Sequence, residues 1–102
     1  MKTSHLADKL YQLRAQKRIQ QKELAAAICV DAPMHSRIEK GTRIPKIEQL
    51  EKFASILDIK LEELQTLMVS NRVAEAVDNE PSKIQSNAMV IVNESLNNIL
   101  YN

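Results

Sequence analysis

Apolar residues recur every three or four positions in successive short stretches of this chain, and that spacing places them on one face of a helix. In residues 4–17, for example, Leu6, Leu10 and Leu13 form such a stripe. The chain contains one glycine and 3% aromatic residues. A sheet protein usually contains more turn-forming, β-branched and aromatic residues than this. The pattern therefore predicts an all-α fold.

Capping residues and helix breakers divide the chain into short segments. Ser4 and Asp31 are favourable N-caps, and Gly41 suits the left-handed backbone that ends many helices. Pro33 is compatible with the start of a helix, because the N–H that it lacks would have no intrahelical partner there. The predicted helices span residues 4–17, 21–28, 31–40, 47–57, 61–77 and 82–101.

The last predicted helix follows the break "DNEPS" and is amphipathic. It is rich in asparagine, a poor helix former, so we expect it to need a partner surface. We expect a first domain over residues 1–70 and a helical extension over residues 71–102. The apolar stripe is a candidate dimer seam, with packing on the first domain as the alternative; it comprises Ile84, Ala88, Val92 and Leu96.

Charge is distributed unevenly along the chain, although the net charge is only +1. Residues 1–46 contain ten Lys and Arg against four Asp and Glu, and residues 47–102 contain four against nine. A basic half beside an acidic half suggests an anionic partner for the basic half. A chance distribution on a solvated surface is the alternative.

The location expected from the sequence is the cytoplasm. The single Cys29 excludes an internal disulfide and fits a reducing compartment. The first residues contain no apolar run of the kind found in a signal peptide. No segment approaches the roughly 20 apolar residues of a membrane span, so we expect no membrane association.

Residues 10–64 closely resemble the phage-repressor-like (Cro/repressor, Xre-like) helix-turn-helix family. The resemblance rests on "LYQLR" at 10–14, "QQKELAAAICV" at 20–30, "SRIEKG" at 36–41, Pro45 and "LDIKLEEL" at 57–64. It implies a five-helix lambda-repressor-like domain, here followed by the C-terminal amphipathic helix. It also implies a transcriptional regulator, expected to be a repressor, that binds double-stranded DNA as a homodimer.

The resemblance also implies where DNA would be contacted. The start of the second helix would hold phosphate, and the outer face of the third helix would enter the major groove. Arg37 is the one side chain there able to make a bidentate contact to guanine, whereas Ala32 and Pro33 offer only apolar contact. The residues assigned to DNA binding are Gln21, Lys22, Ala32, Pro33, Met34, Ser36, Arg37, Lys40, Arg43 and Lys46.

Four further residues carry expectations. By the same resemblance, Arg14 and Glu39 form a structural ion pair between the first and third helices. Cys29 lies in a turn where relatives commonly have glycine, and left-handed backbone there costs a non-glycine residue about 1–2 kcal/mol. We expect a tolerated small residue at Cys29, with a redox-sensitive thiol as the alternative. His35 points inward, and we expect a packed, neutral imidazole with a backbone partner, with a pH sensor as the alternative.

The sequence does not favour an enzyme. Cys29 and His35 are too few for a zinc site, and the lone glycine provides no phosphate-binding loop. We therefore expect no catalytic residue, metal or cofactor. The alternative to a transcriptional regulator is a protein-interaction module, such as an antitoxin or a phage control protein whose C-terminal helix binds a protein partner.

Overall fold

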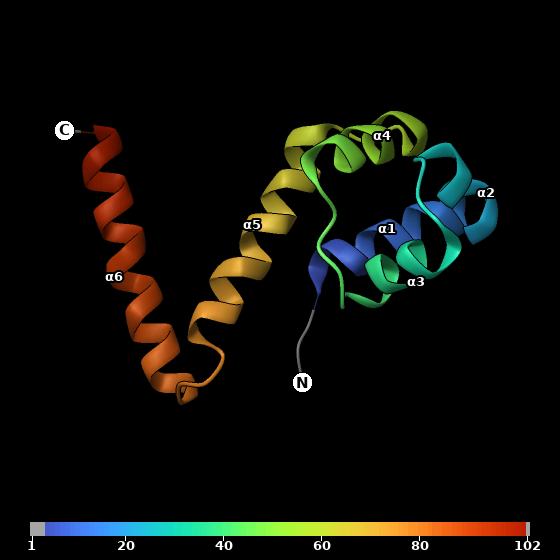
Figure 1. Ribbon diagram of the computed structural model, residues 1–102. Coiled ribbons are helices and arrows are strands. Elements are labelled where there is room, and N and C mark those ends of the chain that lie inside the picture. Colours follow the sequence, from blue (N-terminus) through green and yellow to red (C-terminus); the bar gives the residue numbers. More distant parts are fainter. Residues whose placement is uncertain (1–3, 102) are drawn as a thin grey trace. The chain divides into compact units, whose positions relative to one another are not determined.

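The computed structural model describes the backbone of residues 4–101 and the side chains of residues 4–98. Every regular element in that part of the chain is an α-helix (Figure 1). The predicted all-α fold is confirmed, and the helix limits lie within one residue of the predicted ones. In chain order the helices are α1 (His5–Gln16), α2 (Gln21–Ala27), α3 (Ala32–Lys40), α4 (Ile47–Leu57), α5 (Leu61–Val77) and α6 (Ser82–Tyr101).

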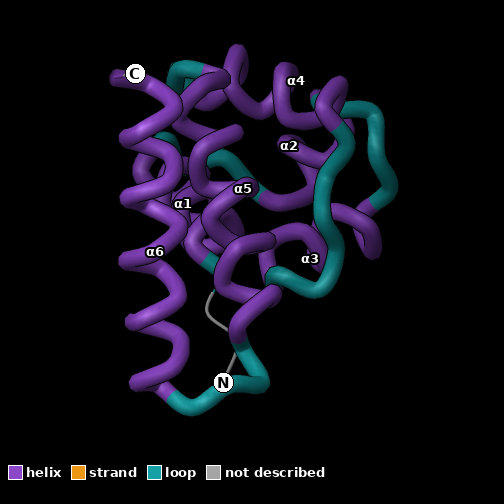
Figure 2. The backbone as a smooth tube through the Cα atoms, turned by 90° about the vertical axis from the view of Figure 1, so that its left-hand side faces the viewer, coloured by secondary structure: helices purple, strands orange, loops and turns teal. Residues whose placement is uncertain are grey.

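The chain divides into two compact units, Met1–Arg72 and Val73–Asn102, so the division falls inside α5. Figure 2 shows that loops connect successive helices along the chain. Among the described residues, no helix is long and apolar enough to span a bilayer.

The core of the first unit lies where α1 packs on α3 and α4, and where α2 packs on α3. Full burial of one large aliphatic or aromatic side chain contributes about 1.5–3 kcal/mol, so this cluster holds α3 firmly. Val30, Leu67 and Met68 are half-buried and pack against the edge of this cluster. The buried cluster comprises Leu6, Leu10, Leu24, Ile28, Ile38, Leu50, Phe53, Ala54, Leu57 and Leu64.

The helices α1 to α4 each end at a residue with left-handed backbone, although only one of the four is a glycine. After α2, Cys29 has φ 61°. The Val30 N–H donates to the Ala25 carbonyl at 3.0 Å and the Cys29 N–H donates to the Ala26 carbonyl at 3.2 Å, which is a Schellman motif. The left-handed turn expected at Cys29 is confirmed. The four residues are Arg18, Cys29, Gly41 and Asp58.

Gly41 is required by close packing as well as by its φ of 80°. A Cβ atom there would lie 2.7 Å from Cβ of Ser4. Ser4 caps α1 by accepting from the Ala7 N–H at 3.1 Å, and Asn71 Nδ2 donates to the same Oγ at 3.3 Å. The Asn71 Oδ1 also accepts from the His5 N–H at 3.1 Å. The end of α3, the start of α1 and the last turn of α5 in this unit therefore meet at one point.

The two left-handed positions Cys29 and Gly41 should respond to substitution in opposite ways. Cys29 is exposed, so Cys29→Gly removes little packing while relieving about 1–2 kcal/mol of backbone strain. Glycine's extra chain entropy offsets about 0.5–1 kcal/mol of this gain. We therefore expect Cys29→Gly to be neutral or stabilising in a urea titration. The control Gly41→Ala should lose at least about 1 kcal/mol. A clear loss of stability in Cys29→Gly would show that the thiol packs usefully.

Candidate nucleic-acid interface

The outer face of α3 gathers most of the residues expected to contact DNA. His35 and Ile38 point into the core, with 0% and 2% of their surfaces exposed. Residues three and four positions apart share a helix face, so Pro33, Arg37 and Lys40 line up on the opposite side. Ser36 is half-buried, and the exposed members of the predicted set on this helix are Ala32, Pro33, Arg37 and Lys40.

The start of α3 is fixed by its cap. Asp31 Oδ1 accepts a hydrogen bond from the Met34 N–H at 2.8 Å, and Pro33 occupies the first turn. The cap satisfies one of the backbone donors that a helix start leaves unpaired. Ala32 and Pro33 then present only apolar surface. The cap thus fixes the start of α3, where the first two residues have no side-chain group able to form a hydrogen bond.

Met34 is less available than its neighbours. It is half-buried and packs against the hydrophobic core, and the Gln49 amide from α4 lies 3.8 Å from its sulfur. Part of this side chain is therefore occupied in joining α3 to α4. Only its remaining surface lies at the edge of the outer face.

The start of α2 leaves backbone donors unpaired within the helix. Gln20 stands at the N-cap and makes no capping bond with its side chain. The first N–H of the helical ladder is that of Leu24, which donates to the Gln20 carbonyl at 3.0 Å. The N–H groups of Gln21 and Lys22 precede it, and both side chains are exposed. Unpaired N–H groups beside a lysine suit an anionic oxygen.

The loop after α3 carries two further basic side chains on an ordered backbone. The Arg43 N–H donates to the Arg37 carbonyl at 3.3 Å, and the Thr42 N–H donates to it at 3.0 Å. The Lys46 N–H donates to Gln49 Oε1 at 2.9 Å as α4 begins. The exposed side chains of Arg43 and Lys46 therefore leave from defined positions near the end of α3. Ile44, which sequence reasoning did not single out, lies between them and is 51% exposed.

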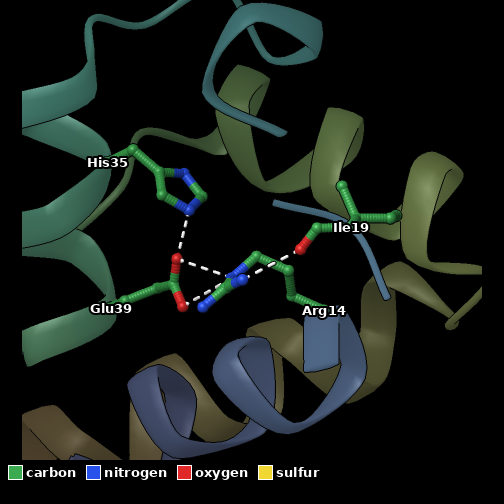
Figure 3. A network of polar contacts seen from close by, with 4 residues as sticks. All are labelled: Arg14, Ile19, His35 and Glu39. Carbon is green, nitrogen blue, oxygen red and sulfur yellow. Dashed lines mark hydrogen bonds and ion pairs between the residues drawn. The ribbon is translucent and has the colours of Figure 1, made fainter. Parts of the chain in front are cut away.

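A buried polar network fixes α3 against α1 (Figure 3). Arg14 Nε donates to both carboxylate oxygens of Glu39, at 2.9 and 3.0 Å. The two side chains are 14% and 3% exposed. Arg14 Nη1 also donates to the Ile19 carbonyl at 2.9 Å. The structure therefore brings together the two residues expected to pair, and connects α3 to the loop directly before α2.

His35 joins this network. The prediction that its partner would be a backbone group is wrong. Its Nε2 contacts the Glu39 carboxylate, one helical turn along α3. Because a carboxylate only accepts, the Nε2 atom carries the proton in this contact. The buried Nδ1 has no hydrogen-bond partner, and the ring lies 5.8 Å from that of Phe53, centroid to centroid. The spacing of His35 and Glu39 by four residues was the signal in the sequence that could have indicated this pair.

The remaining candidate chemistry is sparse. Cys29 is exposed at the end of α2. In the part of the chain that the structure describes, no group of three or more His, Cys, Asp and Glu side chains is placed to hold a metal ion. The outer face of α3 and its flanks offer two guanidinium groups, several ammonium groups and apolar atoms, which can bind an anionic polymer.

Comparisons with known proteins identify a domain that matches this geometry. A family model described as "Helix-turn-helix" matches residues 10–64, more than half of the chain. Among solved structures, the chain is similar to the crystal structure of the clp gene regulator ClgR from Corynebacterium glutamicum. The TM-score is 0.58 with 21% sequence identity, and the match covers 90% of each chain. No curated protein sequence matches the chain.

Proposed function

We propose, from the premise that the chain belongs to the Xre/Cro-like helix-turn-helix family of DNA-binding transcriptional regulators, that it is a repressor whose α3 binds in the major groove of duplex DNA. The carrying observation is the exposure of Arg37 in the middle of the outer face of α3. Its guanidinium matches the two acceptors that guanine presents in that groove. The adjacent Ala32 and Pro33 fit the methyl group of thymine.

Phosphate contacts surround this face in the proposed complex. Lys40 ends α3, Arg43 and Lys46 follow it, and Gln21 and Lys22 stand at the start of α2. Such contacts set position and affinity but carry no sequence information. Arg14 supports both groups of phosphate contacts, those at the end of α3 and those at the start of α2. Its bonds to Glu39 and to the Ile19 carbonyl hold α3 and the residues before α2 at a fixed separation.

Selection of bound duplexes from a random pool tests this function. We expect one enriched sequence, bound at least about a thousandfold more tightly than a scrambled duplex at the same salt concentration. A chain that binds the selected and scrambled duplexes equally would not be a sequence-specific regulator. If the chain binds neither duplex, DNA binding is not its function.

The same proposal makes the protein a homodimer through α6. None of the described α6 side chains, residues 82–98, is buried. Ile84, Val92 and Leu96 are 49%, 47% and 54% exposed, and Ala88 is half-buried. A helix with so much exposed apolar surface gains stability by covering it. Two half-sites about one helical turn apart on DNA also call for two copies of the reading unit.

Charges placed on that face should abolish dimerisation. Val92→Asp combined with Leu96→Asp should give a monomer in sedimentation velocity at micromolar concentration, with weaker binding to the selected duplex, because two buried carboxylates would lack partners. Asn93→Asp with Asn97→Asp is the matched control. It adds the same charge one position along, on the other side of α6, and should remain dimeric. A Val92→Asp/Leu96→Asp protein that stays dimeric refutes the seam.

The exposed apolar face of α6 also favours a second candidate, a module that binds a different protein through this helix. The two are separated by the behaviour of the unmodified chain alone. A protein that is monomeric at tens of micromolar and still binds DNA would favour the second candidate for α6, without affecting the proposal for α3.

A further inference from the structure

We propose that two copies of α6 pair in antiparallel orientation, about a two-fold axis at the level of Val90. This inference rests on the proposed homodimer and specifies its geometry. It follows from the distribution of side chains around α6 and along it.

Six of the seven apolar side chains that the structure describes in α6 lie within about half of its circumference, at about 3.6 residues per turn. The two charged side chains of the helix, Lys83 and Glu94, lie on the other half, and so does Val90. The apolar half thus has no charge to desolvate on association. It comprises Ile84, Ala88, Met89, Ile91, Val92 and Leu96, with the large members between 38% and 64% exposed.

This half of α6 is complementary to itself when one copy is reversed. The level of a residue is its height along the common direction of the two helices. With the two-fold axis at Val90, Ile84 shares a level with Leu96 of the second copy, and Ala88 shares a level with Val92 of the second copy. The same relation places Met89 at the level of Ile91 of the second copy, so every apolar residue of this half has an apolar residue at its level. A two-fold interface requires this kind of self-complementarity, because each contact occurs twice. An unrelated partner would impose no such symmetry on the sequence.

Two polar residues interrupt the apolar half, and they fall at matching levels. Gln85 shares a level with Ser95 of the second copy. Gln85 Nε2 donates to the Glu80 carbonyl at 2.8 Å, and Ser95 Oγ donates to the Ile91 carbonyl at 3.0 Å. The Ser95 hydroxyl and one N–H of the Gln85 amide are therefore already paired with backbone of the same chain. Covering them in a dimer leaves few polar groups unsatisfied.

Parallel pairing fits the same residues less well. It would place Ala88 against Ala88 of the second copy, leaving a gap between larger residues, and would align the two helix dipoles. It would also start both α6 helices side by side, about 8–10 Å apart. In the antiparallel pair the two Ser82 residues lie about 24 Å apart along the axis, at about 1.5 Å per residue.

Disulfide trapping distinguishes the two orientations. Cys29 is the sole cysteine and is exposed, so every variant carries Cys29→Ser. Gln85→Cys and Ser95→Cys are made as separate full-length chains and oxidised alone and mixed. The two positions are about 15 Å apart along α6, whereas a disulfide needs Cα atoms within about 7 Å. The antiparallel pair therefore predicts at least about tenfold more covalent dimer in the mixture than in either chain alone.

The outcomes are decisive. Efficient cross-linking of either chain alone would show parallel pairing and overturn the inference. A dimer that does not cross-link in the mixture would overturn the proposed level of the axis, and a monomer would overturn the dimer itself. Nitroxide labels on Ser95→Cys alone give a second measurement, because antiparallel pairing keeps them at least about 15 Å apart. Binding of the unmodified chain to its selected duplex is measured in parallel, so a failure of the DNA-binding proposal is seen separately.

Discussion

Replacing Glu39 by alanine should lower the free energy of unfolding by about 3–5 kcal/mol. The Glu39 side chain is 3% exposed and receives the Arg14 guanidinium as well as the His35 imidazole. Without it, a largely buried cation keeps the Ile19 carbonyl as its hydrogen-bond partner and the Tyr11 ring as a cation–π partner, and the buried imidazole loses its single hydrogen bond. The loss is a large fraction of the 5–15 kcal/mol that is typical of a folded domain.

Urea titrations of the variant and of the unmodified chain measure this effect. Glu51→Ala is the matched control, because Glu51 is an exposed glutamate on α4 and its removal should change stability by less than about 0.5 kcal/mol. A loss of less than about 1 kcal/mol in Glu39→Ala would mean that water replaces the carboxylate and that the network does little to hold α3.

Replacing Arg37 by alanine should weaken binding to the selected duplex by about 1–3 kcal/mol and remove the preference at one base pair. The physical reason is that Ala32 and Pro33 have no polar side-chain atoms with which to replace the lost contact. Arg37 is exposed and lies outside the core, so folding should be little affected. The measurement is a titration of each variant on selected and scrambled duplexes at several salt concentrations.

Lys40→Ala and Arg43→Ala serve as the comparison. Each should weaken binding about equally on both duplexes and reduce the salt slope by about one unit, as expected when one phosphate contact is lost. If Arg37→Ala lowers both affinities by the same factor, Arg37 contacts the backbone instead. Specificity would then come from apolar contacts and the shape of the DNA.

Local features of this chain could be predicted from sequence because their causes lie within a few residues. The capping of α1 by Ser4 and of α3 by Asp31 depends on a side chain and an N–H three positions further along. The left-handed end at Gly41 depends on the absence of a Cβ atom. The spacing of apolar residues similarly defined the helices and most of the core.

The candidate site could be predicted in part. The family resemblance implied that Arg37 and Lys40 lie on the outer face of α3, and they are exposed. It did not reveal that Met34 and Ser36 are partly covered, because that depends on how closely α4 and the rest of the unit approach α3. Left-handed backbone at Arg18 and Asp58 was also missed; aspartate is among the residue types that adopt it more often, whereas arginine gives no such signal.

Sequence alone therefore determined which segments are helices, where they begin and end, and which face of each is apolar, because these properties follow from neighbouring residues. Residue spacing could not show which polar groups meet across the fold; the family resemblance implied the Arg14–Glu39 pair, and the tertiary structure added the others. Asn71 reaches the start of α1 across 66 residues of chain, and Glu39 reaches Arg14 across 25. His35 and Glu39 are close in sequence, yet their contact gains importance from burial, which packing against α1 and α4 provides. The strength of a polar contact depends on its exclusion from water, and that exclusion is a property of the assembled helices.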